Sequence, residues 1–407
     1  MLGRIVLVSA LVVVIAARCG LSRANADEPA SGPFDYAFAG ARAALRANGT
    51  PAQPTGAEPA TGTGTDSAAG TEGEPGPTIG TGRRAAAIGL AIVPGVIARG
   101  LGSAVARRPE TSRRLLILGA LGVGAATIGG FPLLATYGSG KLIVPGVHLA
   151  VGGAGLITAS WWSDIWSAAG GDRLGGHARA LPELAVELGV TWHHDAYLGE
   201  RGLLAPAVEL RRGRRAARFS GLLAVDGSAF GGRVEGEVRP WSRAPLDGPS
   251  AAPARHTGSA LAIRAAVQYH AERGQGFSLA TGELAVRGRL ELGRIDPHLR
   301  GSFLELEEGL GLELVTYDAG PLEGSTLLLS RIEWGVYLPA GRGEVSVFYD
   351  HRRDHMAGGV LAGPAAGFFG SIGLAAELVA ARGWLLRARG EVGSAVLSTI
   401  VLRRELR

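Results

Sequence analysis

Two short stretches of this sequence combine histidine with acidic side chains, the residue types that bind divalent metal ions. Residues 193–195 read His-His-Asp, and residues 351–355 read His-Arg-Arg-Asp-His. Neither spacing matches an established metal motif, so solvated positions at strand ends or in loops explain both stretches better. Counted along the predicted strands, they follow the first and the tenth strand, and we therefore expect them on opposite rims. The two stretches predict no metal site, alone or together.

Three carboxylates lie close together at Glu305, Glu307 and Glu308, and paired carboxylates perform glycoside hydrolysis. A polar strand edge accounts for them more simply. Residues 100–102, Gly-Leu-Gly, lack the further glycine and the strand-turn-helix context of a dinucleotide site. No histidine has a spacing that suggests a Ser-His-acid triad, although spacing is a poor guide to such triads. The sequence therefore assigns no catalytic, cofactor-binding or metal-binding residue, and no cofactor.

The first 26 residues have the organisation of a secretory signal peptide. Arg4 precedes an apolar run over residues 5–17, and residues 24–26, Ala-Asn-Ala, form a small-x-small cleavage site. The apolar run is too short to span a bilayer, which argues against a retained anchor, and Arg18 before Cys19 argues against lipoprotein processing. Cys19 is the only cysteine, so cleavage after residue 26 would leave a chain without disulfides or thiolate metal sites.

The composition is that of a membrane protein. The 407 residues are 46% hydrophobic and 19% charged, with a mean hydropathy of +0.19 and 65 glycines. A soluble protein of this size is less apolar, and the glycines follow no collagen-like period. The formal net charge is +5 and the isoelectric point is about 9.8, but the basic residues are scattered and form no stripe beside stacking aromatic residues. We therefore exclude nucleic acid as a partner.

Residues 27–83 are predicted to be a disordered linker. From residue 47 onward they consist mainly of Pro, Gly, Thr, Ala and Glu. Ordering such a segment would bury too little apolar surface to offset the loss of chain entropy.

Residues 84–180 are predicted to be an apolar helical region, with uncharged segments at residues 85–98, 115–135 and 142–163. The second and third segments have the length of membrane-spanning helices. Turn-like residues 137–141 join them, which predicts a helical hairpin. Glycines at spacings of three and four would let the two helices pack closely, but they also dilute the hydrophobicity and argue against firm insertion in the inner membrane. The sequence leaves open whether the hairpin lies in a membrane, against a barrel wall or in a lumen.

From residue 181 to residue 407 the hydrophobic period changes to two. Apolar and charged residues alternate near residues 183–193, 261–269, 284–292, 331–338 and 384–392. Strands of about ten residues with one apolar and one charged face suit a barrel in lipid, because closure leaves no sheet edge unpaired. On this pattern we expect an all-β antiparallel membrane barrel of roughly 12 to 14 strands. A soluble periplasmic β-sandwich would show the same alternation, but the charged faces and the simple meander favour the barrel.

Connection lengths give a second test of the barrel. They are short at residues 226–227, 339–341 and 381–383, and long at residues 242–257 and 352–367. Alternating short and long connections are typical of a barrel with short periplasmic turns and long outer loops. Strand counts from the two ends of the chain place the long loops on different rims. The counts agree only if one further strand exists, which we expect upstream of residue 181.

A barrel also assigns a direction to each side chain of a strand, because side chains alternate. Three apolar residues near residue 334 are expected to face hydrocarbon, and the residues between them to face the lumen. The outward set is Ile332, Trp334 and Val336, and the lumen set is Arg331, Glu333 and Tyr337. Other lumen-facing arginines are expected at Arg264, Arg287, Arg289, Arg387 and Arg389.

Through the signal peptide, the period-two repeat and the loop pattern, residues 181–407 resemble the bacterial outer-membrane β-barrel class. They depart from it at Leu406-Arg407, where that class usually has an aromatic residue. The resemblance implies a location in the cell outer membrane, with the lipid bilayer and the barrel assembly machinery as partners. The expected function is that of a non-enzymatic barrel, either a passive pore or a structural surface protein. The alternative is a membrane-tethered periplasmic or outer-membrane enzyme whose catalytic residues the sequence does not identify.

Overall fold

The computed structural model describes residues 80–135, 140–195, 199–246, 257–273, 276–317, 322–351, 370–393 and 395–406. The predicted signal peptide, and the predicted linker up to residue 79, lie outside these ranges. The last residues assigned to the linker are helical, because helix α3 already begins at Thr81.

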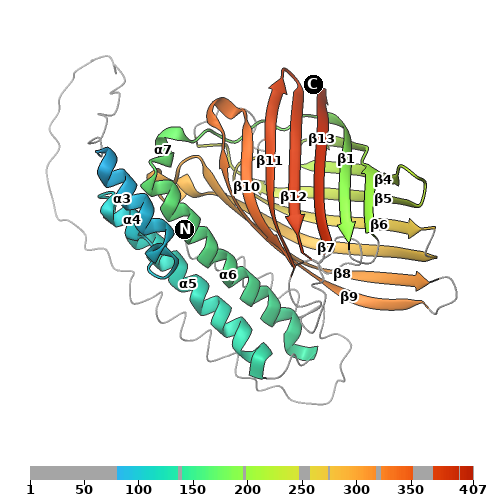
Figure 1. The fold of residues 1–407 in the computed structure, drawn as a ribbon, viewed down its shortest axis with the longest axis horizontal. Coiled ribbons are helices and arrows are strands. Elements are labelled where there is room, and N and C mark those ends of the chain that lie inside the picture. Colours follow the sequence, from blue (N-terminus) through green and yellow to red (C-terminus); the bar gives the residue numbers. More distant parts are fainter. Residues whose placement is uncertain are drawn as a thin grey trace, which may run out of the picture. The chain divides into compact units, whose positions relative to one another are not determined.

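The described chain begins with a helical region (Figure 1). It contains α3 (Thr81–Ile92), the 3-10 turn η1 (Pro94–Val96), α4 (Leu101–Val105), α5 (Pro109–Ala135), α6 (Gly140–Ala168) and α7 (Gly171–Leu174). The long helices α5 and α6 form the predicted hairpin, and both are long and apolar enough to span a membrane.

Glycine contacts hold α5 and α6 together. Gly122 and Gly129 of α5 lie against Gly153 and Gly146 of α6, and a Cβ atom at Gly129 would lie 2.5 Å from the Gly146 carbonyl oxygen. Gly130, one residue further along, meets no atom within 4 Å. The predicted close packing is therefore confirmed, and it depends on the glycines of one helix face.

The rest of the described chain forms antiparallel strands (Figure 1). They are β1 (Leu184–Asp195), β2 (Gly199–Leu204), β3 (Ala207–Arg212), β4 (Arg215–Ala224), β5 (Ala229–Ser242), β6 (Ala260–Glu272), β7 (Phe277–Glu291), β8 (Ser302–Tyr317), β9 (Glu323–Tyr337), β10 (Gly343–Asp350), β11 (Ser371–Ala381), β12 (Trp384–Val392) and β13 (Ala395–Leu406). Short 3-10 turns η3 (Leu292–Arg294) and η4 (Pro297–Leu299) connect β7 to β8, and η5 (Pro339–Gly341) connects β9 to β10.

These strands close into a barrel, because β1 pairs with β13 along its whole length, from Leu184 opposite Leu406 to Asp195 opposite Ala395. Strands β2 and β3 share one position in the wall. Both pair with β1 on one side and with β4 on the other, and Ala205 between them exchanges backbone hydrogen bonds with Gly189 of β1. The 13 strands therefore occupy twelve positions, within the predicted range.

Side chains alternate across the barrel wall as predicted. On β1, Glu187 and His193 are buried in the lumen, whereas Val186, Leu188 and Trp192 are exposed on the outside. Other strands extend this apolar outer band through Val208, Phe219, Val234, Val267, Leu284, Leu312, Leu374, Leu386 and Ile400. A closed sheet with an apolar outer face is the form that lipid requires. It excludes the soluble β-sandwich.

The loop-length prediction is wrong. We call the rim that carries the start of β1 and the end of β13 the terminal rim, and the opposite one the far rim. β5 ends and β6 begins at the terminal rim, whereas β10 ends and β11 begins at the far rim, so the two long connections join strands at different rims. The strand expected upstream of residue 181 is also wrong for the described residues, since helices precede β1 there.

The hairpin packs on the outer wall of the barrel, where α6 contacts β9 and β8. Trp334 of β9 donates from Nε1 to Ser163 Oγ at 3.0 Å and stacks on Trp162 at 5.8 Å. Ile332 fits against Gly155 of α6 and is only 7% exposed. Both residues face outward as predicted, but the prediction that they contact lipid is wrong, because α6 covers them.

Candidate functional site: the charged lumen and its mouth

The inward face of the barrel consists largely of arginine and glutamate. All six arginines expected in the lumen lie there, and each pairs with a lumen carboxylate. Some pairs join strands that are not neighbours in the wall, such as Arg289 of β7 and Glu344 of β10 at 2.7 Å. Such a pair can form only through the interior. The charges therefore form a network that reaches across the lumen.

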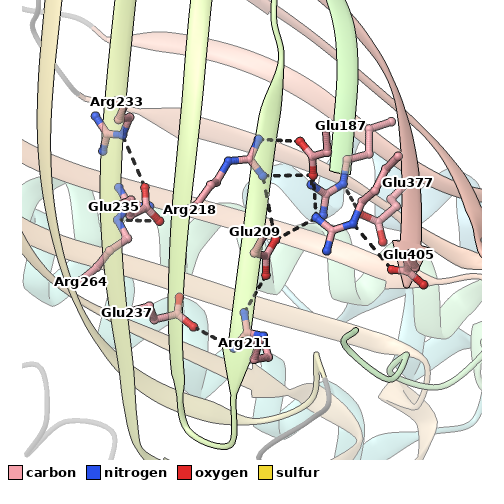
Figure 2. Close-up of polar contacts among 12 residues, drawn as sticks. Glu187, Glu209, Arg211, Arg218, Arg233, Glu235, Glu237, Arg264, Glu377 and Glu405 are labelled. Atoms are coloured by element: carbon pink, nitrogen blue, oxygen red, sulfur yellow. Dashed lines mark hydrogen bonds and ion pairs between the residues drawn. The ribbon is translucent and has the colours of Figure 1, made fainter. Parts of the chain in front are cut away.

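Glu187 of β1 is the centre of one cluster in this network (Figure 2). Its carboxylate accepts hydrogen bonds from Arg218 of β4 at 2.6 Å, Arg387 of β12 at 2.7 Å and Arg403 of β13 at 2.6 Å. Arg403 also donates to Glu209 of β3 at 2.8 Å, and its side chain is completely buried. Buried charges are tolerated when they are paired and hydrogen-bonded. This cluster connects five strands, β1, β3, β4, β12 and β13, through side chains alone.

A second cluster connects β5, β6, β7 and β8. Arg233 donates to both oxygens of Glu283, at 2.9 and 2.5 Å, which is a bidentate pair. Arg264 reaches Glu307 at 2.8 Å. Glu235 lies near both arginines, 3.4 Å from Arg233 Nε and 3.8 Å from Arg264 Nε (Figure 2). The two clusters together cross-link strands around most of the barrel.

Aromatic rings fill space between the guanidinium groups. Phe348 of β10 lies between Arg331 and Arg389, whose guanidinium carbons are each 4.4 Å from its ring centroid. Arg289 stacks on Phe303 at 3.6 Å. Cation–π contacts of this kind hold a charge while excluding water. A cavity beside Arg289 measures about 30 Å³, the room of about one water molecule.

A segment of the chain crosses the lumen at the terminal rim. We call residues 175–183, between α7 and β1, the mouth strap; in Figure 1 the chain runs from α7 to the start of β1. At one end of the strap, Gly176 N donates to Tyr337 O of β9 at 2.9 Å. At its other end the strap continues into β1, almost half the circumference away from β9 in strand order. Between these ends, Arg179 contacts Thr257, just before β6, as well as β11 and β13 on the opposite side of the wall, so the strap passes over the mouth.

Arg179 anchors the strap. Its guanidinium binds Glu377 of β11 at 2.5 Å and Glu405 of β13 at 2.6 Å. Its backbone N donates to Thr257 Oγ1 at 3.0 Å, and its carbonyl oxygen accepts from Thr257 N at 2.9 Å. Burial lowers the pKa of Arg179, but the two carboxylates outweigh it and hold the pKa above the ordinary arginine value. The anchor therefore stays charged at physiological pH.

Apolar and polar contacts complete the closure around Arg179. Ala178 is buried against Phe303 and Tyr337, and the Tyr337 hydroxyl donates to the Thr257 carbonyl oxygen at 3.0 Å. Strap, wall and Thr257 thus form one packed unit at the mouth.

Of the two histidine stretches, the structure describes residues 193–195 and His351. Residues 193–195 end β1 and His351 follows β10, so both lie at the far rim, and the prediction of opposite rims is wrong. The reason is that β2 and β3 share a position, which makes β10 the ninth. His194 stacks on Trp192 on the outer face, and His351 lies 2.8 Å from the Tyr349 hydroxyl; residues 352–355 lie outside the described ranges. Among the described residues, no group of three or more His, Cys, Asp or Glu is placed to hold a metal.

The carboxylates at Glu305, Glu307 and Glu308 are divided between two faces of β8. Glu305 points into the lumen, 3.7 Å from Arg287, and Glu307 also points inward. Glu308 points outward and pairs with His148 of α6. The three side chains therefore do not surround a common space.

The Gly-Leu-Gly stretch at residues 100–102 serves helix packing. Gly100 has a φ of 83° where α4 begins, a conformation that favours glycine. A Cβ atom at Gly102 would lie 2.6 Å from the Ala91 Cβ atom. The buried carboxylate of Asp164 accepts from Gly102 N at 3.0 Å and Ser103 N at 2.8 Å, and so caps α4.

Sequence reasoning missed Arg179 and the pair of His148 with Glu308. Nothing in residues 175–183 predicts the strap, because the segment has no periodicity. The sequence does predict, however, that one of the two adjacent carboxylates points outward. Adjacent residues of a strand point to opposite faces, so Glu307 and Glu308 cannot both face the lumen.

No family model and no curated protein matches the sequence. Among solved structures, the KdgM porin matches with 7% identity and a TM-score of 0.33, over 54% of this chain and 99% of that chain. The outer membrane protein Omp33 of Acinetobacter baumannii matches with 9% identity and a TM-score of 0.29, over 55% and 98%. The β domain of the Bordetella autotransporter Brka matches with 12% identity and a TM-score of 0.32, over 56% and 100%. These likenesses concern the barrel fold alone.

Proposed function

We propose that this chain is an outer-membrane β-barrel protein with a closed lumen, whose role is structural and not that of a passive pore. The mouth strap carries the proposal, because Arg179 ties it to β11 and β13 across one end of the lumen. Behind the strap, ion pairs between non-neighbouring strands occupy the interior. A passive pore needs a continuous water-filled path. The mouth strap and the ion pairs behind it would obstruct such a path.

The outer face of the barrel supports the membrane location. The apolar band is bounded by aromatic residues, with Trp241 and Trp384 towards the terminal rim and Trp192 and Tyr269 towards the far rim. Such girdles mark the two interfaces of a bilayer. We place the terminal rim on the periplasmic side. An exported chain reaches the outer membrane from the periplasm, and the chain leading into β1 meets the barrel at this rim. The enzyme alternative has less support, since the lumen carboxylates pair with arginines.

Conductance measurements test the proposal. Purified protein in planar lipid bilayers should show no steady open-channel current, because strap and network block the lumen. Arg179→Ala removes both ion pairs of the strap and should produce brief openings that the unmodified protein lacks, because only one of the two barriers remains. The matched control is Arg382→Ala, which removes an exposed arginine from the same rim and should leave the current unchanged. A steady ohmic current through the unmodified protein would contradict the closed lumen.

A further inference from the structure

A polar cluster lies on the outer wall of the barrel, the face that otherwise meets lipid. Glu308 occupies an outward position near the middle of β8, and Ser330 lies opposite it on β9. Glu308 accepts from Ser330 Oγ at 2.8 Å and pairs with His148 Nδ1 of α6. All three side chains are buried. An outward carboxylate in mid-wall is unfavourable in hydrocarbon, so this part of the wall requires a polar cover.

Helix α6 supplies that cover and follows the wall towards the terminal rim. Beyond His148, it contacts β9 through Gly155, and then through the hydrogen bond from Trp334 to Ser163. At the terminal rim the start of α5 is also fixed, because Thr111 Oγ1 donates to Asp296 Oδ1 at 3.0 Å. The hairpin is therefore held at mid-wall and at one rim.

The other face of the hairpin is apolar, and the described part of the chain leaves it uncovered. Leu116, Val123, Ile128, Phe131 and Leu134 of α5 are exposed, and only 22% of the most apolar stretch of this helix is buried. A core helix of a soluble protein would be mostly buried. No Asp, Glu, Lys or Arg occurs in residues 115–140. Ile128 is 67% exposed, close to the 64% of Leu374 in the outer band of the barrel.

We propose that α5 and α6 form a transmembrane hairpin in the same bilayer as the barrel, with α6 locked to β8 and β9 by His148, Glu308 and Ser330 and with lipid hydrocarbon covering α5. A 27-residue helix is about 40 Å long, enough to cross a hydrocarbon core of about 30 Å with some tilt. His148 and Glu308 would each be costly alone in lipid and satisfy each other when paired. Hairpin and barrel are thus one membrane unit. The inference rests on the proposed membrane location of the barrel.

A double-mutant cycle tests the lock. His148→Leu and Glu308→Leu should each lower the thermal midpoint of the purified protein, because each leaves one polar partner buried alone. The double variant should be more stable than the sum of the two losses predicts, since it leaves neither partner behind. Thr158→Leu, at an exposed position of α6, replaces His148→Leu in the control cycle and should show additivity with Glu308→Leu. Additivity in the His148 cycle as well would overturn the lock.

Spin labels test the lipid contact in reconstituted vesicles. Cys19 is the only native cysteine, so Cys19→Ser gives a clean background for Ile128→Cys, Leu374→Cys and Asp226→Cys. The label at residue 128 should collide with oxygen and not with an aqueous nickel chelate, as at residue 374. Access to the chelate, as expected at residue 226, would overturn the inference while the barrel stands. Access to neither reagent would mean that a protein, such as a second copy, covers α5, and would also overturn it. A label at residue 374 that meets the chelate would instead refute the membrane location of the barrel.

Discussion

Adjacent arginines on the last strand offer a direct test of the charged lumen. Arg403 points inward, is completely buried and donates to Glu187 and Glu209 at 2.6 and 2.8 Å. Arg404 points outward, where its guanidinium lies 4.9 Å from the Trp384 ring. Arg403→Met and Arg404→Met make the same chemical change at neighbouring positions of β13. Any difference between the two variants in the free energy of unfolding therefore reflects the difference between the lumen and the outer face.

The expected magnitudes follow from what each variant leaves behind. Removing one partner of a buried ion pair costs about 3–5 kcal/mol, because the other charge loses compensation. After Arg403→Met, Glu187 keeps Arg218 and Arg387, and Glu209 keeps Arg211 at 3.0 Å. We therefore expect the lower end, about 3 kcal/mol. Arg404→Met loses a partly exposed cation–π contact, worth about 0.5–1 kcal/mol.

Urea unfolding of the protein in detergent, followed by the gel shift of unheated samples, measures both losses. Midpoints convert to free energies through the slope of the same titration. Equal losses for the two variants would mean that the network around Glu187 adds no stability beyond that of a surface contact. A larger loss for Arg404→Met would reverse the assigned faces of β13.

Three further variants test other elements. Gly129→Ala places a Cβ atom 2.5 Å from the backbone of α6, whereas Gly130→Ala meets open space. Both variants gain about 1 kcal/mol of helix propensity. Their difference in unfolding free energy should therefore equal the overpacking cost at Gly129, about 1–3 kcal/mol. Val267→Arg puts a charge on the outer band and should cost about 2–4 kcal/mol, whereas Gln268→Glu, beside Arg233 in the lumen, should barely change the urea midpoint. Asp164→Ala removes the cap of α4 and should cost about 1–3 kcal/mol by the same titration; an unchanged midpoint would contradict the capping role.

The alternation of apolar and charged residues predicted the barrel, because each strand must present polar side chains to water or ions on one side and apolar side chains to lipid on the other. Alternation alone does not distinguish lipid from a helix as the outer neighbour of a strand. Ile332 and Trp334 have the residue types of a lipid-facing strand, yet α6 covers both. An apolar helix and hydrocarbon select the same side chains, so only the polar exception at Glu308 marks the covered part of the wall.

The charge of the lumen could be predicted from the sequence, but whether the lumen is open or closed could not. Inward arginines such as Arg387 follow from period two, but whether they line a channel or cross it depends on partners far away in the chain. Arg387 pairs with Glu187, 200 positions earlier. The mouth strap could not be predicted from the sequence for a related reason. Arg179 can anchor the strap only after closure of the barrel brings Glu377 and Glu405 together.

The seam between β1 and β13 has a consequence for how the protein reaches its final state. The paired residues Leu184 and Leu406 are more than half the chain length apart, and contacts of such separation form slowly, because the intervening chain must first be ordered. Until then both strands present unpaired backbone groups, which invite pairing with other chains. Seam closure should therefore be the slow, concentration-sensitive step of biogenesis. We expect a helper that holds these two edges to raise the yield of closed barrel more than any change in the hairpin.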